Sequence, residues 1–312
     1  MALTGFDKYF LNLPPFDRKD DFHDFWNAAI AQARRIPLDP TITKNSRKSN
    51  HRFTVYDISY SGFMKSAVFG ELLIPRAARG PRVIVHIPDY NTNPSLPQQI
   101  LDDSVAYFFT VLRGHANLIK PSPGTEEQSS PGYMIENILD RDTYYVKAVY
   151  LDILRSLDML RLIKEVNCAS IGLYGKGFGA AAAIFAAAHY DRVGALVLDT
   201  PSFCHLALSQ NLSTSDAARE INEFIASSKG KKKVVKDNLT YFDALNFADA
   251  VTCPVRATVG FKDTVSPPEC VFSLFNHILS EKLIEVFPDE GNTAGGNEQF
   301  LKSIAWLAEQ IA

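Results

Sequence analysis

The stretch that most constrains the fold is residues 171–188, where an apolar run meets a glycine-rich turn and then an alanine-rich run. Residues 171–174 end a short apolar segment that is typical of a buried strand. Residues 175–179 read G-K-G-F-G, and glycines permit a sharp backbone turn. Residues 180–188 are strong helix formers. The sequence therefore predicts a strand, a tight turn and a helix, with Gly177 in the middle of the turn.

Apolar runs and amphipathic segments alternate along the rest of the chain. The first two predicted strands, residues 53–60 and 67–74, are separated by a turn at Gly62 and favour a hairpin. The later strands alternate with helices, which favours a mostly parallel central sheet flanked by helices on both faces, an α/β fold. The later strands are predicted at residues 82–87, 106–112, 195–199, 254–260 and 283–287, and the helices from Asp20 to before Pro37, at 142–166 and at 298–311.

We expect one domain over residues 1–312, with three features added to its core. Residues 1–40 are predicted to form an N-terminal arm and helix. Residues 114–132 are rich in Gly, Pro, Ser and Glu, and a loop of this length in a compact domain is usually functional or part of an interface. Residues 215–248 are predicted to form a small helical insertion.

Composition excludes several classes of protein. The net charge of −3 gives no basic surface for nucleic acid, and the basic run at residues 229–233 is interpreted as a solvated loop or helix end. The four cysteines are scattered without a C-x-x-C pair, so we expect no metal site and no cofactor. The N-terminus lacks the pattern of a signal peptide, and no apolar run approaches the ~20 residues of a membrane span. We therefore expect a cytoplasmic protein that does not bind membranes.

The strand–turn–helix pattern is that of the G-x-S-x-G turn of α/β-hydrolases, whose catalytic triad follows the chain order nucleophile, acid, histidine. The middle residue is Gly177, which has no side chain to attack a carbonyl. Asp263 follows a predicted strand, where the acid should be. The histidine should follow the last strand, yet residues 288–296 contain none. His277 precedes that strand in an apolar helical run, and we expect it on the surface of a helix.

Several segments in combination resemble the acetyl xylan esterase and cephalosporin-C deacetylase family, carbohydrate esterase family seven. The resemblance implies an α/β-hydrolase fold, removal of acetyl groups from short xylo-oligosaccharides and related small esters, and a homo-oligomer that is commonly a hexamer. The segments that carry it are the opening helix with Phe22, Phe25 and Trp26, residues 37–40, residues 131–133, 138–140 and 143–145, residues 241–248, and residues 263–268.

The resemblance implies that two members of the triad are replaced. Asp263 retains the acid, whereas Gly177 stands at the position of the serine and Asn292 at that of the histidine. Acyl transfer through a covalent intermediate needs a side-chain nucleophile and a base that takes its proton. Glycine cannot attack, and the neutral amide of asparagine is no base near neutral pH.

The resemblance also implies an altered oxyanion hole and pocket. The backbone N–H groups of Tyr90 and Phe178 would form the hole, where the family has a glycine before the tyrosine and this chain has Asp89. A carboxylate aimed into the hole would oppose the developing oxyanion. His115 replaces the glutamine of the R-G-Q signature, and we expect a structural role for it. Lys176 is interpreted as a surface lysine or a new charge in the pocket rather than as a nucleophile.

Our leading hypothesis is that the chain has lost esterase activity but retains the scaffold, the oligomer surfaces and a pocket for a small acetylated sugar or ester-like ligand. Two alternatives remain open at this stage. One is an active deacetylase of carbohydrates or small esters that uses a relocated nucleophile. The other is a structural or regulatory subunit that assembles with an active relative.

Overall fold

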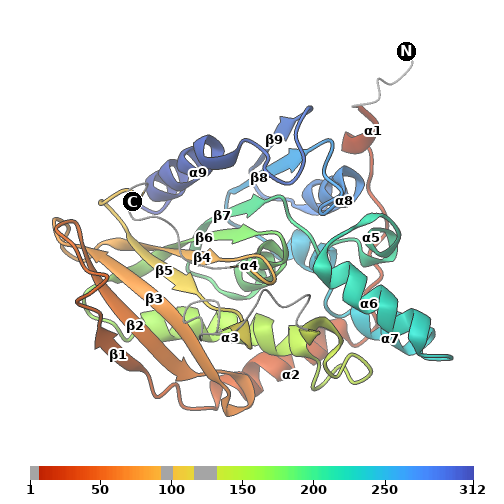
Figure 1. The fold of residues 1–312 in the computed structure, drawn as a ribbon, viewed down its shortest axis with the longest axis horizontal. Coiled ribbons are helices and arrows are strands. Elements are labelled where there is room, and N and C mark those ends of the chain that lie inside the picture. The colour runs from red at the N-terminus through yellow and green to blue at the C-terminus, as the bar shows by residue number, and fades with distance from the viewer. Residues whose placement is uncertain (1–6, 93–100, 116–131) are drawn as a thin grey trace.

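This computed structural model describes residues 7–92, 101–115 and 132–312. The strands in these residues form one sheet. Its strand order is β1-β2-β3-β5-β4-β6-β7-β8-β9 (Figure 1). The pairs β1–β2, β2–β3 and β3–β5 are antiparallel, and the five pairs from β5 to β9 are parallel, which confirms the mostly parallel sheet. The strands are β1 (Thr41–Lys44), β2 (Phe53–Ser61), β3 (Ala67–Pro75), β4 (Arg82–Ile87), β5 (Ala106–Thr110), β6 (Asn167–Lys176), β7 (Val193–Asp199), β8 (Val255–Gly260) and β9 (Lys282–Phe287).

Helices cover both faces of the sheet (Figure 1). The apolar side of α9 packs on one face, and α2, α3 and α4 contribute to the larger core on the other face. None of the helices in the described residues is long and apolar enough to span a lipid bilayer. The α-helices are α1 (Asp7–Phe10), α2 (Phe22–Arg34), α3 (Tyr145–Leu160), α4 (Phe178–His189), α5 (Leu206–Leu212), α6 (Asp216–Ser227), α7 (Lys232–Leu239), α8 (Pro268–His277) and α9 (Gly296–Gln310), and short 3₁₀ turns are η1 (Phe63–Lys65), η4 (Tyr133–Ile135) and η5 (Ala244–Ala250).

The central strands of the sheet show why the apolar runs of the sequence do not alternate between apolar and polar residues. β4 and β7 are almost entirely buried because helices cover both of their faces, as is usual for parallel strands. α4 follows β6 directly, and its row of alanines lets the helix backbone approach the sheet closely. Gly179 shows how close, because a Cβ atom there would overlap the carbonyl oxygen of Ile87 at the end of β4.

The structure differs from the predicted elements mainly at the edges and in the added segments. β1 was not predicted because its four residues are all exposed and too few to show a pattern. The predicted helix over residues 142–166 is shorter, at Tyr145–Leu160. The predicted insertion contains α6, α7 and most of η5. Most of the predicted long loop, residues 116–131, lies outside the described residues.

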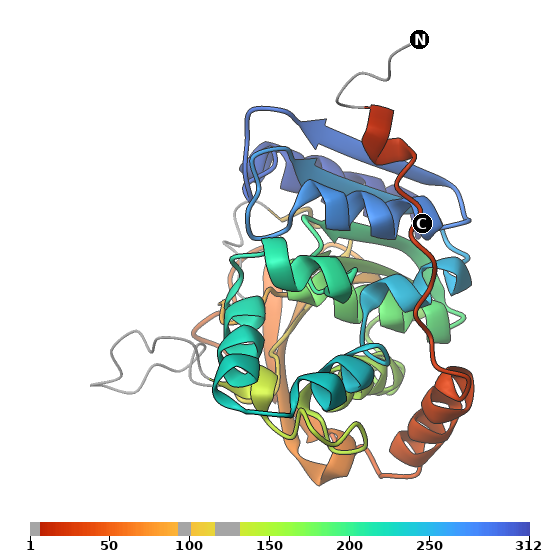
Figure 2. The ribbon, with the colours of Figure 1, turned by 90° about the vertical axis from the view of Figure 1, so that its right-hand side faces the viewer.

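The N-terminal segment crosses the outside of the molecule from α8 to α2 (Figure 2). The side-chain amide of Asn12 donates to the carbonyl of Glu269 and to the hydroxyl of Ser273, both at 2.8 Å. The ring of Phe16 lies 4.5 Å from that of His277. His277 is therefore buried, and the prediction that it lies on a helix surface was wrong, because the helical pattern does not reveal what a distant segment will cover.

Candidate functional site

The turn between β6 and α4 places Gly177 at the carboxyl edge of the parallel strands. Its backbone angles are φ 52° and ψ −119°, a conformation that is costly for residues other than glycine. The N–H of Gly177 donates to the carbonyl of Asp199 at 3.0 Å, and its own carbonyl accepts from the N–H of Ser202 at 3.0 Å. The turn is therefore held from β7 and from the loop after it. The geometry is that of the tight strand-to-helix turn that the sequence predicts.

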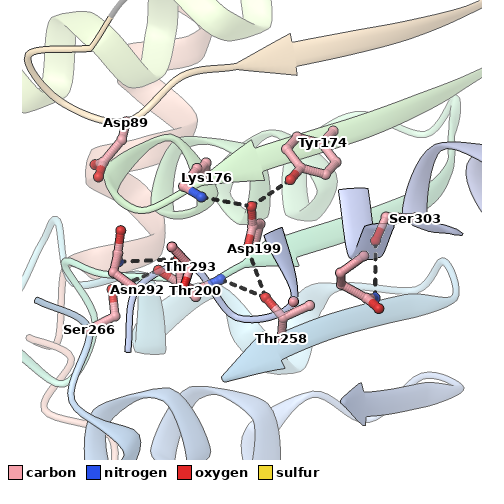
Figure 3. Close-up of polar contacts among 12 residues, drawn as sticks. Asp89, Tyr174, Lys176, Asp199, Thr200, Thr258, Ser266, Asn292, Thr293 and Ser303 are labelled. Atoms are coloured by element: carbon pink, nitrogen blue, oxygen red, sulfur yellow. Dashed lines mark hydrogen bonds and ion pairs between the residues drawn. The ribbon is translucent and has the colours of Figure 1, made fainter. Parts of the chain in front are cut away.

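Asp89 lies beside this turn, in the loop after β4 (Figure 3). Its Oδ1 atom accepts the backbone N–H of Tyr90 at 2.8 Å and that of Phe178 at 2.7 Å. The family resemblance assigns these two N–H groups to the oxyanion hole. A Cβ atom added to Gly177 would overlap the Asp89 carboxyl group. One carboxylate thus occupies both N–H groups and the space that a side chain at position 177 would need.

The environment of Asp89 disfavours its charged form. Burial raises the pKa of Asp89 to about 6, although the N–H groups of Phe178 and Tyr90 and the charge of Lys176 act in the opposite direction. The desolvation of the carboxylate therefore outweighs three stabilising interactions. At neutral pH most of the Asp89 carboxyl groups are still ionised, so the N–H pair faces a negative charge.

Asp263 and Asn292 are brought together from the loops after β8 and β9. The Asp263 Oδ1 atom accepts the N–H groups of Val265 and Ser266 at 2.8 and 2.9 Å. Its Oδ2 atom accepts from the Asn292 side-chain amide at 3.3 Å. That amide also lies 3.4 Å from the hydroxyl of Thr200. Burial raises the pKa of Asp263, and these N–H groups together with Lys176 limit the rise.

Lys176 is paired with an acid that no sequence motif indicated. Its ammonium group lies 3.2 Å from the carboxylate of Asp199, the last residue of β7 (Figure 3). The hydroxyl groups of Tyr174 and Thr258 also donate to Asp199, at 2.5 and 2.9 Å. The sequence places Asp199 at the end of a predicted strand, but only the structure shows that Lys176 ends the neighbouring strand and is paired with it in register. The side chain of Lys176 is 36 % exposed, so its free end meets solvent beside the turn.

His115 and Glu220 support the loop that carries Tyr90. The ring of His115 lies 5.1 Å from that of Tyr90, and its Nδ1 atom lies 3.0 Å from the carbonyl of Arg113. Burial lowers the pKa of His115, which favours the neutral form of the ring. The buried carboxylate of Glu220 on α6 accepts from the Tyr90 hydroxyl at 3.0 Å and from the N–H of Met134 at 2.9 Å. No local pattern in the sequence distinguishes Glu220 from the other polar residues of this helix.

The predicted site residues gather at one edge of the sheet, although not all of them meet. Asp89 contacts the turn at Gly177. The charge of Lys176 acts to lower the pKa of both Asp89 and Asp263. His115 reaches this group only through the ring of Tyr90. Within the described ranges, no group of three or more His, Cys, Asp or Glu side chains is placed to hold a metal ion. The cluster offers hydrogen-bond donors and acceptors, with neither a side chain at position 177 nor a base at position 292.

A mostly parallel sheet, helices on both faces and a tight glycine turn from β6 into α4 define an α/β-hydrolase fold. More specifically, residues 1–310 match the family model described as acetyl xylan esterase (AXE1), and the chain belongs to that family.

Individual relatives are similar over nearly the whole chain. The acetyl esterase Axe7A of Xylanibacter ruminicola is 24 % identical over 96 % of this chain and 69 % of its own length. The structure of an acetyl xylan esterase from Paenibacillus sp. R4 superposes with a TM-score of 0.87 at 24 % identity, covering 99 % of this chain and 100 % of its own. Acetyl xylan esterase 1 from Thermoanaerobacterium sp. gives 0.86 at 20 % identity and covers 99 % of each chain. These structures share the fold.

Proposed function

We propose that this chain is a member of the acetyl xylan esterase family that binds a small ligand without hydrolysing it. The observation that carries the proposal is the pair of hydrogen bonds from the Tyr90 and Phe178 N–H groups to Asp89 Oδ1. An oxyanion hole stabilises negative charge that develops in the transition state. Here a charge of the protein's own occupies the donors, so the carbonyl oxygen of an ester would have to displace it.

The residues at the proposed nucleophile and base positions support the same function. Gly177 stands at the proposed nucleophile position and carries no side chain, and Asn292 stands at the proposed position of the base. Asn292 donates its amide to Asp263, so the retained acid has a new partner in place of a histidine. Without nucleophile and base, a scaffold of this kind retains at most about 10³–10⁴-fold acceleration over water, from binding and the oxyanion hole. Because the Asp89 carboxylate occupies the oxyanion hole, the contribution of the hole is lost as well.

The ligand that suits the site is a small acetylated sugar or ester-like molecule bound through its hydroxyl groups. Asp89 offers carboxylate oxygen, and Lys176 offers a partly exposed ammonium group. Sugar hydroxyls both donate and accept hydrogen bonds, so they can satisfy both groups. An ester carbonyl only accepts, and the acceptor position at the Tyr90 and Phe178 N–H groups is filled.

The experiment compares the natural chain with two rebuilt variants, using p-nitrophenyl acetate as substrate. The double variant Gly177→Ser with Asn292→His restores the two proposed catalytic residues. The triple variant adds Asp89→Gly. Because removal of oxyanion-hole donors costs about 10²–10³-fold in kcat, we expect the triple variant to be at least about 100-fold faster than the double variant. Asp89→Gly alone is the matched control, and we expect its rate to stay far below that of the triple variant, because it frees the oxyanion hole but supplies neither nucleophile nor base.

Two results would contradict the proposal. One is turnover by the natural chain that a fluorophosphonate probe abolishes, since covalent labelling would reveal a relocated nucleophile. The other is a double variant as fast as the triple variant, which would mean that Asp89 leaves the hole without cost. In the double variant the Asp89 carboxyl group must also move aside, because it occupies the space that the serine Cβ needs.

Assembly and location belong to the proposal as well. The family resemblance implies a homo-oligomer, and the composition favours a cytoplasmic protein. Native mass spectrometry of the chain alone should show one defined oligomer. The same measurement with an active relative added tests a role as a structural or regulatory subunit, and mixed oligomers would support that role.

A further inference from the structure

A second charged site lies at the opposite edge of the sheet from Gly177. β6 begins there at Asn167, whereas its other end carries the proposed active-site turn. A hollow of about 500 Å³ lies over the start of β6. The side chains that matter in its lining are Arg79, Arg161, Lys164, Asn167, Cys168 and Arg192.

The positive charge in this hollow comes from side chains in three separate loops. Arg79 lies between β3 and β4, Arg161 and Lys164 lie between α3 and β6, and Arg192 lies between α4 and β7. All four side chains are exposed, and none lies within 4.0 Å of a carboxylate in the described residues. The lining includes no acidic residue, in a chain whose net charge is −3. Like charges gathered in this way repel one another unless an anion lies between them.

Cys168 shows that two of the four cations lie close to one another. Burial raises the pKa of Cys168 to about 11, and the positive charges of Arg161 and Arg192 both limit the rise, so both lie near this thiol. The Asn167 Oδ1 atom accepts from Arg82 Nη1 at 3.1 Å and from the N–H of Ala169 at 3.0 Å. With that oxygen engaged, the Asn167 amide nitrogen remains as a neutral donor in the lining of the hollow.

We propose that this hollow binds a small ligand that carries two or more linked phosphate groups. Guanidinium groups pair with phosphate oxygens through two parallel hydrogen bonds, and three of the four cations are arginines. A linked pair of phosphates carries a charge of about −3 near neutral pH, which suits a set of four cations better than a single phosphate does. The volume lies in the ordinary range of small-ligand pockets.

Isothermal titration calorimetry with inorganic tripolyphosphate tests the site. We expect saturable binding to the natural chain, with Kd below about 100 µM at low salt. The double variant Arg161→Gln with Arg192→Gln should weaken binding by at least about tenfold, because two charged hydrogen-bonding groups are removed. The matched control is Lys231→Gln with Lys233→Gln, which removes the same charge at exposed positions of the basic run, and its affinity should be unchanged.

Four results would overturn the proposal. They are no binding of tripolyphosphate, an equal loss of affinity in the lysine control, equal affinity for inorganic orthophosphate, and binding of a short oligonucleotide without binding of tripolyphosphate. If the first double variant unfolds, as a circular-dichroism melt would show, Arg79→Gln with Lys164→Gln removes two other cations of the same hollow. An unchanged Kd in that variant would equally overturn the site.

Discussion

At the scale of the residue, Asp89 determines the chemistry that remains at the proposed active site. Its carboxylate accepts two backbone N–H groups, yet burial raises its pKa to about 6. The folded protein therefore holds the Asp89 proton more tightly than the unfolded chain does. The cost to stability is absent below the ordinary carboxyl pKa, grows as the pH rises, and is complete above about pH 6.

We predict that Asp89→Asn removes this pH dependence. The amide oxygen can still accept both N–H groups, but it carries no charge to desolvate. Relative to the natural chain, the variant should gain almost no stability at pH 4 and about 1–3 kcal/mol above pH 6. Urea unfolding across pH 4–7.5 measures the difference. Asp289→Asn is the control, because that side chain is 93 % exposed and its substitution should leave the profile unchanged. A gain that falls with rising pH would contradict the prediction.

The sequence predicts which residues belong to the proposed site, but it does not predict how they contact one another. Comparison of motifs placed Asp89 before Tyr90, and placed Gly177 and Asn292 at the proposed catalytic positions. The orientation of the Asp89 carboxylate could not be predicted, because it depends on the N–H group of Phe178, 89 residues further along the chain. Asp199 was missed for the same reason, since its partner Lys176 lies on the neighbouring strand.

At the scale of the element, α6 is joined to the site loop through one buried acid. Glu220 accepts hydrogen bonds from the Tyr90 hydroxyl and from the N–H groups of Gly132 and Met134. These bonds connect the helical insertion to the loop after β4 and to the turn η4. The backbone that carries Asp89 is thereby held from outside the sheet.

We predict that Glu220→Gln loosens this connection. A glutamine side chain retains one acceptor oxygen, so at least one of the present bonds must be lost or weakened. The expected loss of stability is about 1–3 kcal/mol, measured by urea unfolding, with faster hydrogen exchange in α6 and η4. Glu223→Gln on the same helix is exposed and should have little effect. Equal effects of the two substitutions would show that Glu220 has no special role.

At the scale of the whole molecule, the N-terminal segment links distant parts of the fold. Asn12 holds it to α8, and Arg18 is paired with Asp249 in η5. The segment thereby covers His277 and part of the apolar surface of α8.

We predict that Asn12→Ala destabilises the protein by about 1–2 kcal/mol, since two hydrogen bonds between the N-terminal segment and α8 are lost. Thermal unfolding followed by circular dichroism measures the effect. Asn211→Ala is the control, because that exposed side chain makes a single long bond of 3.4 Å. The prediction fails if both variants melt at the same temperature as the natural chain.

The sequence by itself determined the alternation of buried strands and helices in the central sheet, the glycine turn from β6 into α4, and the absence of a nucleophile and a histidine at the proposed triad positions. These features are local, because hydrophobic period, backbone freedom and side-chain chemistry are properties of a few consecutive residues. The tertiary structure alone decided three others: the carboxylate of Asp89 on the Tyr90 and Phe178 N–H groups, the burial of His277, and the gathering of four cations over the start of β6. Each depends on segments distant in sequence, and only packing brings such segments within the few ångströms over which hydrogen bonds and paired charges act.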